Sequence, residues 1–128
     1  MSLKQTLRLM VVDDMSTSRA IITQCLDELG LINYSTENSG SSALGKLVSN
    51  PVHLVLSDYN MPGMSGLDLL KALRENRSTQ RIGFILVTGK ATKEMVEAGQ
   101  RHGLNNLIKK PFTNEAMKQC IERVVGRL

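Results

Sequence analysis

The sequence alternates five times between a short apolar run and a longer stretch whose apolar residues have helical spacing. The apolar runs occupy 7–12, 32–36, 53–57, 83–87 and 105–109, and the helical patterns occupy 16–29, 41–49, 66–75, 92–102 and 113–127. Strands that alternate with helices predict a parallel sheet with helices on both faces. Five such units suit the doubly wound strand order 2-1-3-4-5, which places the first strand beside the third.

Polar side chains stand where four of the five apolar runs end. Asp13 and Asp14 follow the first run, Asp58 the third, Thr88 the fourth and Lys110 the fifth. The carboxyl ends of parallel strands form the ligand-binding edge of an open sheet, so we expect these side chains in one crevice. Three carboxylates there favour a hard divalent cation, while a hydroxyl and an ammonium group favour a phosphoryl group.

Four motifs at these strand ends resemble the receiver domains of two-component response regulators, specifically the single-domain chemotaxis (CheY-like) type. The motifs are VVDDMSTSR, LSDYNMPGMSGLDLL, LVTG and KKPFT, and the resemblance covers essentially the whole chain. It implies an α/β, flavodoxin-like (βα)5 fold that forms one receiver domain over residues 1–128. It also implies a signalling protein that takes a phosphoryl group from a chemotaxis-type histidine kinase, and not an enzyme with a separate substrate.

The resemblance assigns a role to each strand-end residue. It implies that Asp58 is the phosphoacceptor, that Lys110 pairs with Asp58 and then with a phosphoryl oxygen, and that the Thr88 hydroxyl bonds another phosphoryl oxygen. Its implied cofactor is Mg²⁺, with four protein ligands: Asp13, Asp14, Asp58 and the backbone carbonyl of Asn60. Phosphoryl transfer depends mostly on positioning and charge stabilisation, so this short set of residues is chemically sufficient.

The output of such a protein is expected through protein contact. The resemblance implies a surface formed by helix 92–102, strand 105–109 and helix 113–127, which carries Lys93, Lys109 and Lys118. Chemotaxis receivers usually have an aromatic residue three positions before the lysine, and this chain has Leu107 there. Leu107 has neither a hydroxyl nor a flat ring to expose on switching. We therefore expect weaker binding to the flagellar motor switch, a different partner, or a phosphate sink that drains the kinase.

Two further positions are expected to influence the loss of the phosphoryl group. Asn60 lies two residues after Asp58, and Lys90 lies two residues after Thr88. In the resemblance, both positions flank the path of the hydrolytic water. Asn60 is expected to orient that water and Lys90 to cover or attract the phosphate, and a phosphatase is a further candidate partner.

Three other functional classes fit the residues less well. An Asp-nucleophile phosphatase of the haloacid dehalogenase type needs a second carboxylate where this chain has Asn60. A flavodoxin-like cofactor binder needs hydrogen-bond donors after the first strand, whereas Asp13 and Asp14 would repel a phosphate. A nucleic-acid module is suggested by the twelve basic and six acidic residues of 66–128, but the four aromatic residues of the chain offer no stacking platform. A solvated basic face is the simpler expectation.

Composition limits the remaining possibilities. The longest apolar runs are far shorter than the roughly 20 residues that a membrane helix requires, and no signal region opens the sequence. We expect a cytoplasmic monomer without membrane contact. Cys25 and Cys120 lie in helical patterns without CxxC spacing, so they are expected to be small buried side chains. Gly63 and Gly66 are expected to permit a positive φ in the loop after Pro62.

Overall fold

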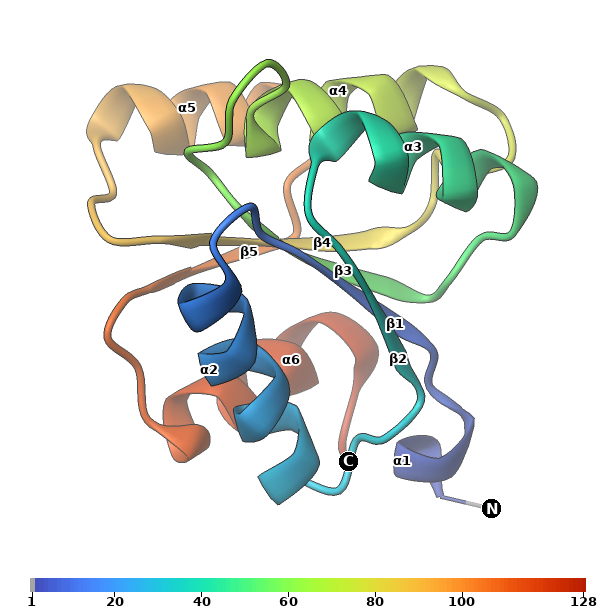
Figure 1. The fold of residues 1–128 in the computed structure, drawn as a ribbon, viewed down its shortest axis with the longest axis vertical. Helices are drawn as coiled ribbons and strands as arrows, with labels where there is room; N and C mark the ends of the chain where they lie inside the picture. Colours follow the sequence, from blue (N-terminus) through green and yellow to red (C-terminus); the bar gives the residue numbers. More distant parts are fainter. Residues whose placement is uncertain (1) are drawn as a thin grey trace.

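The computed structural model, which describes residues 2–128, contains one sheet of five parallel strands in the order β2-β1-β3-β4-β5 (Figure 1). The strands are β1 (Leu9–Val12), β2 (Tyr34–Glu37), β3 (Leu54–Asp58), β4 (Gly83–Thr88) and β5 (Asn106–Lys109). This is the doubly wound order that the alternating pattern predicts, with β1 and β3 side by side at the point where the order reverses.

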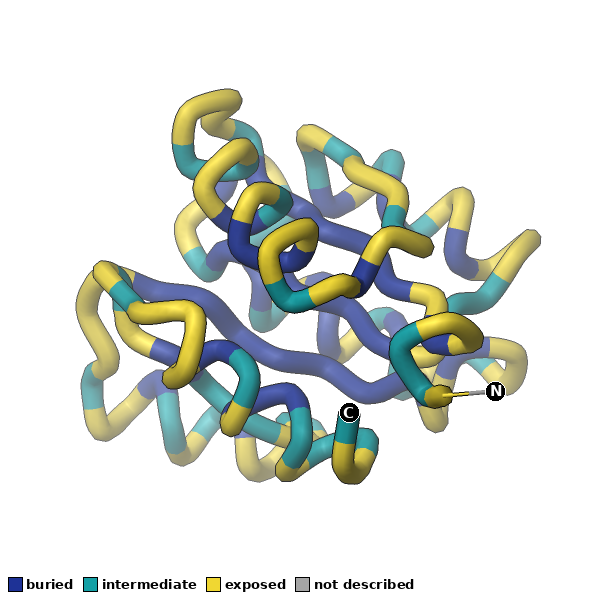
Figure 2. Tube along the Cα trace, turned by 90° about the horizontal axis from the view of Figure 1, so that it is seen from below, coloured by how far each residue is buried: buried dark blue, intermediate teal, exposed yellow. Residues whose placement is uncertain are grey.

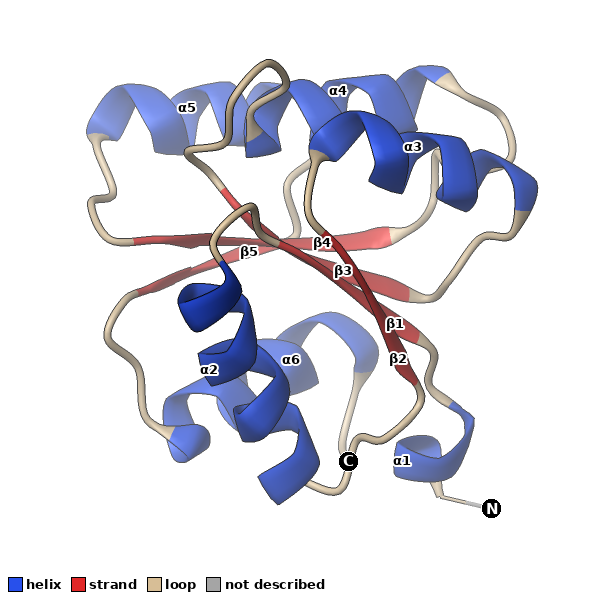
Figure 3. Cartoon of the chain, viewed as in Figure 1, coloured by secondary structure: helices blue, strands red, loops and turns tan. Residues whose placement is uncertain are grey.

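The helices form a layer on each face of the sheet (Figure 3). One layer contains α2 (Ser16–Glu28) and α6 (Asn114–Val125), and the other contains α3 (Gly40–Ser49), α4 (Gly66–Glu75) and α5 (Lys93–Arg101). None of the helices within residues 2–128 combines the length and the apolar character needed to cross a membrane.

Each strand contributes side chains to two separate cores, because successive side chains of a strand point to opposite faces. Leu54 and Leu56 of β3 pack in the core beneath α2 and α6, whereas Val55 packs in the core beneath α3, α4 and α5. β1, β3 and β4 are buried along their whole length, and Figure 2 shows them as a dark layer between partly exposed helices. The two cores hold the carboxyl ends of these three strands at one edge.

The amino-terminal segment departs from the expected pattern. Residues Leu3–Thr6 form a short helix, α1, in which the Gln5 side chain accepts a hydrogen bond from the backbone N–H of Ser2 (3.2 Å). Leu7 follows this helix and is buried as a core residue, and β1 begins only at Leu9. The apolar character of Leu7 therefore reflects burial and not membership of the strand.

Candidate functional site

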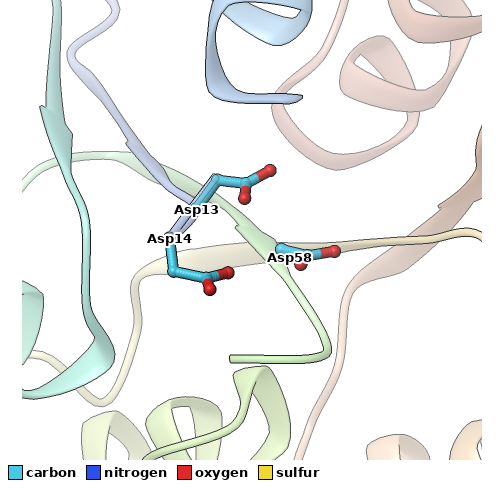
Figure 4. A group of neighbouring side chains, drawn as sticks. All are labelled: Asp13, Asp14 and Asp58. Carbon is cyan, nitrogen blue, oxygen red and sulfur yellow. The ribbon is translucent and has the colours of Figure 1, made fainter. Parts of the chain in front are cut away.

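Two neighbouring strand ends bring three carboxylates together. Asp58 is the last residue of β3, and Asp13 and Asp14 directly follow β1, which pairs with β3. Figure 4 shows the three side chains at these ends, and one carboxylate oxygen from each lies within 4.8 Å of the others. The convergence expected from the sequence is therefore present.

Asp58 is largely buried and lines an open cleft. Its relative exposure is 7%, and desolvation raises the pKa of its carboxyl above the ordinary value. A hydrogen bond and the positive charge of Lys110 act in the opposite direction, and the charge of Asp13 adds to the rise. The pKa of the Asp58 carboxyl thus depends on the balance between burial and the positive charge near it.

Lys110 connects the carboxylates to α2. Its Nζ lies 3.0 Å from Oδ1 of Asp58 and 3.8 Å from Oδ2 of Asp13, and it donates a hydrogen bond to Oγ of Ser18 (2.9 Å). Only 28% of the lysine side chain is exposed, so the ammonium group is held between acidic groups and not in open solvent. Lys110 lines the same cleft as Asp58.

Asp13 and Asp14 differ in how their carboxylates are used. Asp13 is fully buried, and its two oxygens accept hydrogen bonds from the backbone N–H of Met15 (3.0 Å) and from the hydroxyl of Ser18. Asp14 has a buried Oδ1 with no hydrogen-bond partner within residues 2–128. A buried acceptor without a donor is costly unless another group satisfies it.

The unpaired oxygen of Asp14 and the close approach of three carboxylates fit a divalent cation. Carboxylate oxygens are among the ligands that Mg²⁺ prefers, and the ion keeps several waters in its octahedral shell. Oδ1 of Asp14 accepts no hydrogen bond from the described residues, so it can bind such an ion without losing one. Both oxygens of Asp13 already accept hydrogen bonds at the start of α2. The residues present therefore fit the cofactor that the sequence implies.

Ser18 and Arg19 also belong to the site, although their positions in the sequence do not predict this. The Ser18 hydroxyl donates to Asp13 and accepts from Lys110, and Nη1 of Arg19 donates to the backbone carbonyl of Asp13 (2.8 Å). Both residues lie on the first turn of α2, directly after the acidic pair. Their place in the motif VVDDMSTSR was the only signal of this role.

Thr88 ends β4 and faces the same cleft as Asp58. Its hydroxyl forms a local turn, because Oγ1 lies 3.2 Å from both the backbone N–H and the backbone carbonyl of Lys90. Asn60 and Lys90 are exposed and also line the cleft. The structure thus brings the two expected dephosphorylation residues to the rim around Asp58, and the use of the Asn60 carbonyl as a metal ligand stays a prediction.

The residues expected in the output surface lie on three adjoining elements. Leu107 is half-buried on β5, pairs in register with Leu86 and packs against the core beneath α3, α4 and α5. Lys93 begins α5, Lys109 ends β5 and Lys118 lies on α6. No ion pair among residues 2–128 involves these three lysines. Lys93 and Lys109 are exposed, whereas Lys118 and Leu107 are half-buried.

Gly66 corrects one expectation about the loop after Asp58. Gly63 has the expected positive φ of 76°, but Gly66 does not have a positive φ. Gly66 is required for close approach instead, because a Cβ there would lie 2.4 Å from the backbone oxygen of Asp58. Its own N–H donates to the carbonyl of Tyr59 (2.8 Å), so the start of α4 lies directly against the loop that follows Asp58.

We expect Gly66→Ala to destabilise the fold by roughly 1–3 kcal/mol, because the added methyl group must displace the backbone at Asp58. Gly45→Ala is the matched control, since Gly45 is inside α3 and a Cβ there meets nothing within 4 Å. That change should stabilise the protein by about 0.5–1 kcal/mol through helix propensity. Urea unfolding of both variants measures the effects, and equal effects would contradict the close-approach argument.

The two cysteines lie outside the cleft and are buried. Cys25 and Cys120 are buried free thiols, as expected, and burial raises the pKa of each to about 11. These thiols are therefore protonated and unreactive at neutral pH.

Known proteins resemble the chain along nearly its whole length. The family model "Response regulator receiver domain" matches residues 9–122. A probable chemotaxis protein CheY of Rhizobium etli is 37% identical over 128 residues, which cover 100% of this chain and 99% of that protein. The chemotaxis protein CheY of Pseudomonas aeruginosa is 34% identical over 122 residues, 95% of this chain and 98% of that protein. Among solved structures, chemotaxis protein CheY4 of Vibrio cholerae has a TM-score of 0.85 at 26% identity, covering 92% of this chain and 98% of that one.

Proposed function

Because the chain belongs to the response regulator receiver family of two-component signalling, we propose that it accepts a phosphoryl group from a histidine kinase on Asp58. The observation that carries this proposal is the contact of the Lys110 ammonium with the Asp58 carboxylate beside two further acidic residues. A carboxylate so placed can act as a nucleophile toward phosphorus.

In the proposed reaction, a carboxylate oxygen of Asp58 attacks the phosphorus atom of a phosphohistidine. The new O–P bond forms as the P–N bond breaks, and the imidazole of the donor keeps the electron pair and takes up a proton. The product is an acyl phosphate on Asp58. The cleft that opens over Asp58 gives a donor residue access to this oxygen.

Lys110 positions the Asp58 carboxylate and stabilises the negative charge of the phosphoryl group during the transfer. It holds the Asp58 carboxylate before the reaction and can move its hydrogen bond to a phosphoryl oxygen afterwards. Ser18 keeps the ammonium group near the site, because its hydroxyl accepts one of the lysine N–H groups. Electrostatic groups that are in place before the reaction need no reorganisation when charge develops.

Asp13, Asp14 and Asp58 would hold Mg²⁺, with the Asn60 backbone carbonyl as a further ligand. When bound, the ion would neutralise the phosphoryl oxygens and the carboxylates around them. The Thr88 hydroxyl would donate a hydrogen bond to another phosphoryl oxygen, which requires it to give up its present hydrogen bond to the Lys90 carbonyl. The turn at 88–90 would then change its hydrogen bonds when Asp58 is phosphorylated.

Asp14→Asn should weaken Mg²⁺ binding by roughly tenfold or more, because the variant loses a charge next to the ion. Asp27→Asn removes an equal charge from an exposed position on α2 and should leave the affinity unchanged. An NMR titration with Mg²⁺ measures both constants. Equal affinities in the wild type and Asp14→Asn would exclude Asp14 from the ligand set.

The output is proposed to occur through the surface that contains Lys93, Lys109, Lys118 and Leu107. The flagellar motor switch is the leading proposed partner, because the chain is similar to chemotaxis proteins named CheY. A phosphate sink is the second candidate, favoured by Leu107 in place of an aromatic residue. Lys90 and Asn60 are proposed to set the lifetime of the acyl phosphate, with or without a separate phosphatase.

Two measurements test the proposal. In the first, a chemotaxis-type histidine kinase that carries a labelled phosphoryl group is incubated with this protein. The label should move to this protein only when Mg²⁺ is present, and the absence of transfer would contradict the proposed function. The affinity for a motor-switch peptide is then compared with and without beryllium fluoride, which mimics the phosphoryl group. A rise in affinity supports motor output, whereas transfer without any rise in affinity supports the phosphate sink.

A further inference from the structure

A hollow lined by basic residues lies at the end of the sheet opposite to Asp58. It occupies about 530 Å³ and is lined by residues that directly precede three strands and by the loop before β4. Arg8 precedes β1, His53 precedes β3 and Ile82 precedes β4. Because β3 extends over five residues at about 3.3 Å each, the hollow is roughly 15 Å from the carboxylates. It is therefore separate from the phosphoacceptor site.

The strand starts hold Arg8 and His53 in defined positions. The backbone N–H of Arg8 donates to Nδ1 of His53 (2.9 Å), and the carbonyl of Arg8 accepts from the N–H of His53 (3.0 Å). The Arg8 guanidinium also donates to the carbonyl of Pro51 (3.4 Å). Because Nδ1 of His53 accepts this hydrogen bond, the ring proton of the neutral imidazole is on Nε2. Nε2 is therefore a donor in addition to the Arg8 guanidinium. Both exposed side chains thus offer N–H groups to the hollow.

The loop before β4 displays two more arginines on the same hollow. Thr79 anchors this loop, because it is fully buried and its hydroxyl donates to the carbonyl of Leu73 (2.7 Å). Arg77 and Arg81 lie two residues on either side of Thr79, and both are exposed. The anchored threonine therefore fixes the backbone from which both guanidinium groups project.

None of the described residues that line this hollow carries a negative charge. Arg8, Arg77 and Arg81 line it without any Asp or Glu, and none of the ion pairs found in residues 2–128 includes them. A hollow on α6 differs in this respect, because Glu122 lines it together with the basic residues Lys118, Arg123 and Arg127. Uncompensated arginines around a concave surface favour an anionic ligand.

We propose that the hollow formed by Arg8, His53, Arg77 and Arg81 binds a small molecule that carries at least two phosphate groups. Guanidinium groups recognise phosphate through paired N–H donors, and three of them supply more positive charge than one phosphate group neutralises. The volume is within the range of small-molecule sites, and Val52 and Ile82 provide an apolar wall for the remainder of a ligand. The ligand would lie at the amino ends of β1, β3 and β4, whose carboxyl ends form the proposed phosphoacceptor site.

Titration of the full chain with pyrophosphate and with ATP tests the proposal, in EDTA-containing buffer so that the metal site is not involved. NMR follows the backbone amides of Arg8, His53 and Gly83, and separately those of Asp58 and Thr88. The titrations with pyrophosphate and with ATP are both repeated with the double variant Arg77→Ala/Arg81→Ala. The matched control is Arg123→Ala/Arg127→Ala, which removes the same charge from the hollow on α6. Thermal unfolding confirms that both variants keep the fold.

Saturable binding of either probe is expected, with shifts at Arg8, His53 and Gly83. The Arg77/Arg81 variant should weaken that binding roughly tenfold or more, and the control variant should not change it. Tighter binding of ATP than of pyrophosphate would support a nucleotide, and equal binding would support a polyphosphate group alone. The proposal is overturned by three results: no saturation with either probe, equal losses in both double variants, or shifts confined to the surroundings of Asp58.

Discussion

Replacing Asp58 by Asn is expected to abolish phosphoryl uptake completely. The amide keeps the shape of the side chain but lacks the nucleophilic oxygen of a carboxylate, and neither Asp13 nor Asp14 is placed like Asp58 against Lys110 at 3.0 Å. Incubation with Mg²⁺ and acetyl phosphate followed by intact-mass measurement checks this result. The wild type should gain one phosphoryl group, and Asp58→Asn should gain none.

Asp27→Asn is the control for the same change of side chain at an exposed position. Its phosphoryl uptake should equal that of the wild type, since the Tyr34 hydroxyl that donates to Asp27 can donate to an amide oxygen as well. Retention of full uptake by Asp58→Asn would show that another residue is the acceptor. Loss of uptake in both variants would indicate general damage to the fold, which circular dichroism detects.

Lys110→Met should have opposite effects on the rate of phosphoryl uptake and on the affinity for Mg²⁺. The rate should fall by roughly a hundredfold, because the variant loses an ammonium group already in place to stabilise the transferred phosphoryl. The affinity for Mg²⁺ should rise, because the ammonium group lies 3.0 Å from Asp58 and 3.8 Å from Asp13 and opposes a second cation there. Quench-flow measurement of uptake and an NMR titration of Mg²⁺ give the two values.

Lys71→Met is the matched control, because Lys71 is an exposed lysine on α4 outside the cleft. Both of its values should match those of the wild type. A fall of both the rate and the Mg²⁺ affinity in Lys110→Met would contradict the proposed arrangement, since it would mean that the lysine mainly supports the folded site. An unchanged rate would remove Lys110 from the reaction.

The convergence of Asp13, Asp14, Asp58, Thr88 and Lys110 could be predicted because it follows from topology. Parallel strands in the order 2-1-3-4-5 bring their carboxyl ends to one edge, so residues that follow the apolar runs must meet there. The periodicity of each run was enough to locate these ends within one or two residues. No side-chain detail was needed for this part of the site.

The hydrogen bonds of Ser18 could not be predicted from spacing alone. They depend on the rotation of α2 about its axis and on how far the Lys110 side chain extends from β5, neither of which hydrophobic periodicity defines. The role of Gly66 was misjudged for a similar reason. A glycine after a Pro-Gly turn suggests a positive φ. Gly66 is required instead because its backbone lies too close to the backbone oxygen of Asp58 for a Cβ to fit.

The short helix α1 was also outside the reach of the sequence pattern. Four residues are too few to display a helical period, and an isolated helix of this length is unstable without tertiary support. That support comes from Leu3 and Leu7, which pack against the core beneath α2 and α6. The apolar residues therefore contribute to the core although they precede the strand.

The position of the phosphoryl group after reaction tests the central claim most directly. The wild-type protein is incubated with Mg²⁺ and acetyl phosphate and treated with borohydride, which reduces an acyl phosphate of aspartate to homoserine. Peptide mass spectrometry then locates the reduced residue. We predict homoserine at position 58 alone, and only in samples that contained Mg²⁺. Homoserine at position 13 or 14, or none at any position in a folded protein, would contradict the assignment of Asp58 as the phosphoacceptor.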